Sequence, residues 1–257
     1  MRRMVAALLT LAGLAATASA TEMQAGPATM PANFVYLSAI DPTILQDIRY
    51  AGENNFTGKP VPGYASGECI LQRPAAEALK RVQASLTRRH LSLKVYDCYR
   101  PQRAVLSFVQ WASTPDPAPS TRRFFPTLGK EQLVPLGYIA DKSSHPRGVA
   151  IDLTIVQLPA KAVAAFDPKA AYAPCTADVA ARAPDDSVDM GTGYDCFDTL
   201  SHTADPRIKG AQRRWRRLLL GAMTQQKFEN FEKEWWHYVF PLADQTVYDF
   251  EIVHRAQ

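Results

Sequence analysis

The chain has 257 residues and carries 29 lysines and arginines against 25 aspartates and glutamates, a formal net charge of +4 at pH 7. This near balance argues against the strongly basic surface of a nucleic-acid-binding protein and against a strongly acidic surface. A chain of this length can bury a sizeable core, so we expect one elaborated domain rather than two small ones.

The N-terminus has the three-part layout of a secretory signal peptide. Two arginines precede an apolar run from Val5 to about Ala16, and small residues occupy positions 18–20. The run is shorter than the roughly 20 residues that a membrane-spanning helix needs. We therefore expect cleavage after Ala20 to remove residues 1–20, leaving a mature domain of residues 21–257 with a net charge of 27 − 25 = +2. Such a protein would be periplasmic or secreted, without stable membrane insertion.

Two helices are predicted in the first half of the chain. Pro74 suits a first helical position, and Leu79, Val82 and Leu86 then recur at helical spacing. A second helix should begin at Pro101, after a strand over residues 91–95, which alternate apolar and polar side chains.

The second half of the chain mixes a strand, a long irregular stretch and another helix. Residues 114–126 are rich in proline and serine and predict a loop, whereas residues 148–158 form a strongly apolar strand. Residues 159–202 show little periodicity and predict a long excursion. Residues 209–223 fit an amphipathic helix, and residues 235–240 form a β-prone aromatic run.

The helix over residues 209–223 carries two pairs of basic residues, Arg213-Arg214 and Arg216-Arg217. They could contact an anionic polymer, but a solvated helix face is the expected role. Helices and short strands that do not alternate as βαβ units predict an α+β fold. We expect a single domain with a small, mainly antiparallel sheet flanked by helices.

A histidine and an aspartate stand close together in the segment SSHPRGVAID, residues 143–152. His145 lies at the end of a loop and Asp152 lies in the strand that follows, so both side chains can point into one pocket. Ala150 leaves room on the same face of that strand, and Gly148 permits a sharp turn.

A second histidine and a carboxylate stand in the segment EWWH, residues 234–237. In a strand Glu234 and His237 would point to opposite faces, so we expect a bend at Glu234. Two histidines and one carboxylate are an established catalytic zinc set that leaves a fourth position for water. His145, Asp152 and His237 fit this set, and Glu234 would be free to accept a proton. Alternatively, these are a loop histidine and a capping aspartate, but burying Asp152 unpaired in an apolar strand would be costly.

The chain contains four cysteines, an even number, which in an exported protein makes two disulfides plausible. Spacing alone allows three pairings, and a zinc site built from all four thiolates would need closer pairs. The cysteines are Cys69, Cys98, Cys175 and Cys196.

The spaced motifs S-x-H-x-x-G-x-A-x-D at residues 143–152 and E-x-x-H at residues 234–237 resemble the signature of the D-alanyl-D-alanine dipeptidases. This is the family of the vancomycin-resistance dipeptidases, within the wider group of zinc D-Ala-D-Ala peptidases. Further similar motifs are NFTGKP at 55–60, YDCYRP at 96–101 and MGTGYD at 190–195. The resemblance covers roughly residues 47–250, with the motifs in the expected order.

The resemblance implies one zinc ion per chain in a closed pocket, and cleavage of D-Ala-D-Ala or another small D,D-dipeptide. It implies that His145, Asp152 and His237 bind the zinc and that Glu234 is the general base. The arginine matching Arg100 would stabilise the oxyanion. Its guanidinium can donate hydrogen bonds to the carbonyl oxygen, on which negative charge develops only in the transition state.

The resemblance also assigns two residues to substrate binding. The aspartate matching Asp195 would bind the substrate ammonium, and the serine matching Ser143 would hydrogen-bond the substrate. The signal peptide and the extra cysteines depart from the shorter, cytoplasmic members. An exported enzyme would meet dipeptides released from the cell wall, which favours wall turnover as its setting.

For the cysteines we predict the pairs Cys69–Cys98 and Cys175–Cys196. The first would tie the start of the helix at Pro74 to the strand that presents Arg100. The second would close the excursion next to Asp195, so that each bond braces a site residue on an otherwise mobile loop.

Two other functions use related chemistry. A D,D-carboxypeptidase or an L,D-endopeptidase that trims peptidoglycan stems has the same zinc set but needs an open cleft where Asp195 would hold a free N-terminus. A non-catalytic binding module stabilised by zinc would need neither Glu234 nor Arg100.

Overall fold

The computed structural model describes residues 29–115 and 119–255 of the chain. The expected signal peptide at residues 1–20 lies outside the described residues. None of the helices in the described part of the chain is both long and apolar enough to cross a membrane.

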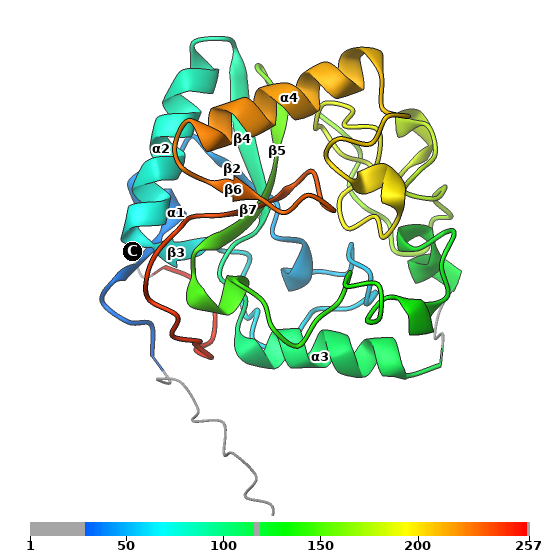
Figure 1. Cartoon of the computed structure of the whole chain (residues 1–257), viewed down its shortest axis with the longest axis horizontal. Helices are drawn as coiled ribbons and strands as arrows, with labels where there is room; N and C mark the ends of the chain where they lie inside the picture. The colour runs from blue at the N-terminus through cyan, green and yellow to red at the C-terminus, as the bar shows by residue number, and fades with distance from the viewer. Residues whose placement is uncertain (1–28, 116–118, 256–257) are drawn as a thin grey trace, which may run out of the picture.

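A five-stranded sheet with the strand order β2-β4-β5-β7-β6 forms the centre of the molecule (Figure 1). Only the pairing of β2 with β4 is parallel, so the predicted mainly antiparallel sheet is confirmed. Its strands are β2 (Leu45–Gln46), β4 (Leu91–Asp97), β5 (Ala150–Gln157), β6 (Glu229–Asn230) and β7 (His237–Val239). A two-stranded antiparallel sheet adds β1 (Phe34–Tyr36) and β3 (Ile70–Gln72).

In the described residues, four α-helices accompany the sheets. Helix α2 packs against both β4 and α4, whereas α3 lies apart from them (Figure 1). They are α1 (Leu37–Ile40), α2 (Arg73–Thr87), α3 (Gln102–Ser113) and α4 (Gly210–Thr224). Short 3₁₀-helices are η1 (Arg49–Ala51), η2 (Pro119–Phe124), η3 (Lys130–Gln132), η4 (His145–Arg147), η5 (Val179–Ala181) and η6 (Thr199–Ser201). The predicted single α+β domain is confirmed.

The strongest periodic signals in the sequence correspond to the observed elements. Helix α2 has Pro74 in its first turn and buries Leu79, Val82 and Leu86 against the core. Helix α3 follows Pro101, and strand β5 spans most of the predicted 148–158 run.

Two predicted segments differ from the structure. The loop expected at residues 114–126 contains the 3₁₀-helix η2. The aromatic run at residues 235–240 pairs only at β7, because Trp235 and Trp236 lie in a turn that buries both indoles. The indole N–H of Trp235 donates to Thr192 Oγ1 at 2.8 Å. The two tryptophans therefore belong to the core of the protein rather than to a longer strand.

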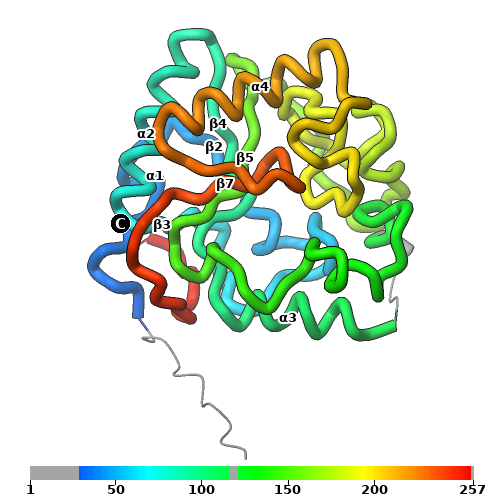
Figure 2. Tube along the Cα trace, viewed as in Figure 1, coloured from blue at the N-terminus to red at the C-terminus, as the bar shows by residue number. Residues whose placement is uncertain are grey.

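The long excursion at residues 159–202 is held by buried charge rather than by regular structure, and it lies on the side of the molecule away from α2 (Figure 2). Asp185 accepts hydrogen bonds from Arg49 at 2.5 Å, Lys94 at 2.7 Å and Tyr96 at 2.8 Å. Burial alone would raise the pKa of Asp185, but the two cations hold it well below its ordinary value.

The prediction that both arginine pairs of α4 lie on a solvated face is wrong for Arg216, which is 2% exposed. Its guanidinium donates to the carbonyls of Met190 at 2.7 Å, Leu200 at 2.9 Å and His202 at 2.7 Å. In an irregular loop such carbonyls lack the N–H partners that a strand or helix would supply. The arginine side chain has five N–H donors and can therefore hydrogen-bond several of these carbonyls at once. Arg216 thereby ties the excursion to α4.

Replacing Arg216 with methionine should lower the free energy of unfolding by about 2–4 kcal/mol, because three buried carbonyls lose their donor. Urea denaturation at one pH measures the change. The matched control is Arg217→Met on the exposed neighbour, which should shift stability by less than about 0.5 kcal/mol. Equal effects of the two substitutions would contradict a bonding role for Arg216.

The Asp185 cluster predicts a pH dependence of stability. Asp185→Asn should cost about 2 kcal/mol or more at pH 7, since it leaves two buried cations short of a partner. A carboxylate with a depressed folded-state pKa stabilises above its unfolded pKa of about 3.9 and loses that contribution as the pH falls. The difference between wild type and variant should therefore shrink by about 1 kcal/mol between pH 7 and pH 3 in urea titrations.

As a control for this titration, Asp167→Asn alters an exposed carboxylate of the same excursion. It should change stability by less than about 0.5 kcal/mol at both pH values. If the difference in the free energy of unfolding between wild type and Asp185→Asn stayed constant from pH 7 to pH 3, the titration of Asp185 would not contribute to stability.

Candidate metal centre and its pocket

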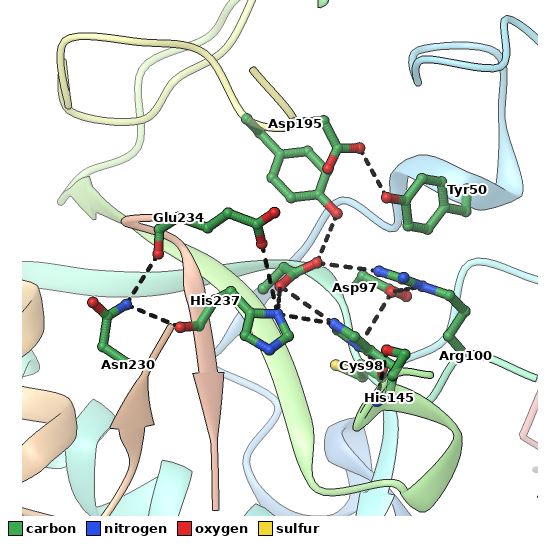
Figure 3. Close-up of polar contacts among 12 residues, drawn as sticks. Tyr50, Asp97, Cys98, Arg100, His145, Asp195, Asn230, Glu234 and His237 are labelled. Carbon is green, nitrogen blue, oxygen red and sulfur yellow. Dashed lines mark hydrogen bonds and ion pairs between the residues drawn. The ribbon is translucent and has the colours of Figure 1, made fainter. Parts of the chain in front are cut away.

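Three adjacent segments bring two histidines and an aspartate together beside the central strands (Figure 3). His145 begins η4, Asp152 lies in β5 and His237 opens β7. Asp152 and His237 are direct partners in the antiparallel register of β5 and β7. Sheet pairing therefore fixes two of the three side chains, and the turn before β5 supplies the third.

That turn depends on Gly148, which ends η4 with a φ of 67°. A Cβ at this position would also lie 2.1 Å from Cε1 of Phe34. Both the left-handed backbone and the close aromatic ring require glycine here, as the sequence indicated.

The three side chains point one atom each at a common centre. His145 Nε2 lies 3.2 Å from His237 Nδ1 and 3.4 Å from Asp152 Oδ1, and His237 Nδ1 lies 2.9 Å from Asp152 Oδ1. A tetrahedral zinc site with bonds of about 2.0–2.1 Å has ligand separations of about 3.3 Å. The three donor atoms are therefore spaced as three corners of such a tetrahedron.

The hydrogen bonds of His145 fix which nitrogen faces this centre. Nδ1 lies 2.6 Å from the carbonyl of Cys98, an acceptor, so Nδ1 carries the proton and Nε2 presents its lone pair. The lone pair of His145 Nε2 and the Asp152 carboxylate oxygen then face each other in the protein interior. Their contact is unfavourable unless a cation lies between them. Burial would raise the pKa of Asp152, but positive charge beside its Oδ1, on protonated imidazoles or on a metal cation that replaces their protons, holds this pKa well below its ordinary value.

Glu234 lies in the expected bend. Its backbone N–H donates to Phe231, and its carbonyl accepts from His237 at 3.3 Å, so a tight turn precedes β7. The carboxylate Oε2 reaches 3.9 Å from His237 Nδ1. Burial, and then the charge of Asp152, raise the pKa of Glu234 to about 8. A cation at the ligand atoms would oppose both effects and return Glu234 to its proton-accepting form.

Arg100 faces the same centre from the end of β4. Its Nε donates to Asp97 Oδ2 at 2.9 Å, and its NH2 group lies 3.5 Å from Asp152 Oδ2. The guanidinium also stands 5.0 Å from the ring centre of Tyr50 and 5.1 Å from that of Phe108. Carboxylates and aromatic faces thus hold Arg100 charged and oriented toward the site.

Asp195 occupies a left-handed backbone position with a φ of 55° and is 5% exposed. The hydroxyl of Tyr50 donates to Asp195 Oδ2 at 2.9 Å. Burial, and then the nearby Asp152, raise its pKa well above the ordinary value. A ligand with a positive charge would therefore be favoured beside this carboxyl.

All seven site residues predicted from the sequence line one cavity of about 290 Å³. Ser143 contributes from the segment just before His145, where its Oγ accepts from the backbone N–H of His145 at 3.3 Å. The seven residues are Arg100, Ser143, His145, Asp152, Asp195, Glu234 and His237.

Three further polar residues of the site were not predicted. Asp97 holds Arg100, Tyr50 holds Asp195, and the hydroxyl of Tyr194 donates to Asp152 Oδ2 at 2.9 Å. A signal for two of them was present, because Asp97 and Tyr194 stand inside the motifs YDCYRP and MGTGYD. Asp97 and its partner Arg100 stand in the same motif, whereas Asp152, the partner of Tyr194, lies 42 residues away in the sequence.

The predicted disulfides Cys69–Cys98 and Cys175–Cys196 are both present. The first includes the residue whose carbonyl holds His145, and the second ends next to Asp195. Both bonds therefore brace backbone that orients site residues, as expected.

Comparison with known proteins identifies relatives over nearly the whole chain. Residues 30–166 and 173–255 match the family described as D-ala-D-ala dipeptidase. The D-alanyl-D-alanine dipeptidase of Enterococcus faecium is 33% identical over 210 residues, which are 82% of this chain and 92% of that protein.

Two further relatives come from other bacteria. The D-alanyl-D-alanine dipeptidase of Streptomyces coelicolor is 32% identical over 226 residues, covering 87% of this chain and 100% of that protein. The D-alanyl-D-alanine dipeptidase of Escherichia coli is 29% identical over 212 residues, covering 81% of this chain and 85% of that protein. The similarity thus spans both ends of the site, from the segment with Arg100 to the segment with His237.

Proposed function

Because the chain belongs to the D-ala-D-ala dipeptidase family and is a metallopeptidase, we propose that it hydrolyses the peptide bond of D-Ala-D-Ala with one zinc ion per chain. The observation that carries the proposal is the convergence of His145 Nε2, Asp152 Oδ1 and His237 Nδ1 beside the half-buried carboxyl group of Glu234. Two imidazoles and one carboxylate leave a coordination position open, which is typical of catalytic rather than structural zinc.

In this proposal His145, Asp152 and His237 hold the zinc. Zinc in such a site supplies Lewis acidity, which polarises a peptide carbonyl and acidifies water. The fixed Nδ1–H of His145 and the sheet register of Asp152 and His237 keep the three donors in place. Little reorganisation is then needed on binding.

Glu234 acts as the general base. Its carboxylate stands beside the ligand atoms and accepts a proton from the attacking water. The same proton can pass to the leaving amine as the peptide bond breaks, so that protons balance over the reaction. Arg100 hydrogen-bonds the substrate carbonyl oxygen as negative charge develops there, since its guanidinium is held at the same centre by Asp97.

Substrate selection rests on Asp195. The buried carboxyl with its raised pKa gains most from a substrate ammonium, which supplies the missing opposite charge. A free N-terminus within reach of the metal ligands corresponds to a dipeptide. Ser143 lines the same cavity and hydrogen-bonds the substrate. This arrangement favours a dipeptidase over an enzyme that trims peptidoglycan stems.

We also propose that the enzyme works outside the cytoplasm, on dipeptides released during cell-wall turnover. Two disulfides support an oxidising compartment. The signal peptide predicted at residues 1–20 would direct the mature chain there.

Glu234→Gln should keep the zinc and the fold but lower kcat by about 10²–10⁴-fold, because an amide cannot accept the water proton. His237→Ala should instead lose zinc affinity. Metal analysis of both dialysed variants, combined with kcat on D-Ala-D-Ala, separates the two roles.

The control for the base is Glu232→Gln, an exposed acid two residues away, which should behave as wild type. Wild-type turnover by Glu234→Gln would remove Glu234 from the mechanism. Undiminished zinc affinity in His237→Ala would remove that ligand from the metal site.

Free D-Ala-D-Ala should be cleaved at least about a hundredfold better than its N-acetyl form. Acetylation removes the charge that Asp195 would pair with, and an unpaired buried carboxylate costs several kcal/mol, where about 1.4 kcal/mol is tenfold. Comparison of kcat/KM for the two substrates measures this preference.

Asp195→Asn keeps the size of the side chain and an acceptor for Tyr50 but removes the charge. This substitution should lower the ratio of kcat/KM for the free dipeptide to that for its N-acetyl form, mainly by slowing cleavage of the free dipeptide. The zinc content should be unchanged. Equal wild-type rates on the free and acetylated substrates would reject the dipeptidase assignment and favour a stem-trimming carboxypeptidase.

A further inference from the structure

The two oxygens of Asp152 have different surroundings. Oδ1 faces the other two ligand atoms, at 2.9 Å from His237 Nδ1 and 3.4 Å from His145 Nε2. Oδ2 points away from them, accepts the hydroxyl of Tyr194 at 2.9 Å and lies 3.5 Å from Arg100. One oxygen is therefore offered to the metal and the other to hydrogen-bond donors of the protein.

The ring of Tyr194 is fixed by its neighbours. It stacks on Tyr96 with ring centres 4.6 Å apart and meets Trp236 edge to face at 5.6 Å. The side chain is 6% exposed. On the backbone side, Gly193 donates to the carbonyl of Cys175 at 2.8 Å, and Cys175 is joined to Cys196. The hydroxyl accordingly has one well-defined position.

We propose that Tyr194 is a positioning residue that sets the rotation of the Asp152 carboxylate and so determines which oxygen binds the metal. The inference rests on the proposed zinc site. The hydroxyl holds Oδ2, which leaves Oδ1 as the single donor atom and keeps the carboxylate from binding through both oxygens. Loss of such an outer hydrogen bond typically weakens metal affinity or activity by about 10–100-fold.

The same hydrogen bond acts on Arg100. Both Tyr194 and Arg100 approach Oδ2, but the phenol is at 2.9 Å and the guanidinium at 3.5 Å. Because the phenol occupies the closer position, Arg100 is kept from a tight ion pair with Asp152. Without the phenol, Arg100 would move toward the carboxylate and away from the substrate carbonyl, and turnover would fall even with metal bound.

Tyr194 also connects metal binding to substrate binding along the chain. The next residue, Asp195, has a left-handed backbone with a φ of 55°, and its carboxyl group accepts a hydrogen bond from the Tyr50 hydroxyl. One dipeptide unit thus holds the ligand carboxylate with one side chain and faces the substrate ammonium with the next. A displacement of this segment changes both functions together.

The test is Tyr194→Phe, which removes one hydroxyl and retains the stacked ring. Zinc affinity, measured by competition with a chromophoric chelator, should weaken by about 10–100-fold. The visible spectrum of the Co²⁺-loaded variant should differ from that of wild type, because the carboxylate coordinates differently. At saturating zinc, kcat should fall while KM changes little.

Tyr96→Phe is the matched control. It removes the hydroxyl of the adjoining ring, which donates to Asp185 and not to Asp152. Its zinc affinity and Co²⁺ spectrum should match wild type, although its stability falls. Thermal unfolding of both metal-free variants shows that each is folded.

The outcomes separate this inference from the proposed function. Wild-type zinc affinity and an unchanged Co²⁺ spectrum in Tyr194→Phe would overturn the inference alone. Equal weakening in Tyr96→Phe would also overturn it, by showing that ring packing is responsible. A wild-type protein that binds no zinc would overturn the proposed metal site and the inference with it.

Discussion

The pairing of three neighbouring strands determines the rest of the structure around the site. Asp97 on β4 lies opposite Asp152 on β5, and Asp152 lies opposite His237 on β7. Two carboxylates in one buried row of a sheet are unfavourable unless positive charge is supplied beside them. Arg100 provides part of it from within the protein, and the lone pairs of the two histidines leave room for a metal cation to provide the remainder.

Much of the chain around this row serves to orient it. Three tyrosine hydroxyls each donate to one carboxylate of the site: Tyr64 to Asp97, Tyr50 to Asp195 and Tyr194 to Asp152. Phenols suit this position, since they bond a carboxylate while their rings remain in the core. The excursion that carries Tyr194 is secured in turn by a disulfide, by the Asp185 cluster and by Arg216.

The sequence was sufficient for elements whose signal is local. Helix α2 has a proline in its first turn and an apolar stripe, and the seven predicted site residues that line the cavity stand in compact motifs at characteristic spacing. The sequence was insufficient where the role of a side chain depends on a partner that is distant in the sequence or that is a backbone group. Arg216 looked solvated because its three acceptors are carbonyls, which leave no mark on residue type. Tyr194 had no periodic signal, because its partner Asp152 is 42 residues away.

The register between β5 and β7 has a consequence for the order in which the chain folds. His237 meets Asp152 across 85 residues, and the hydroxyl of Tyr99 bonds the carbonyl of Phe250 across 151. Contacts this distant in sequence require large loops to close and form slowly. In whichever compartment the chain folds, β7 lies near its C-terminal end and pairs with a strand formed much earlier in the sequence. Until β7 pairs with β5, at most two of the three ligands are in place, so tight binding of a metal requires this long-range pairing.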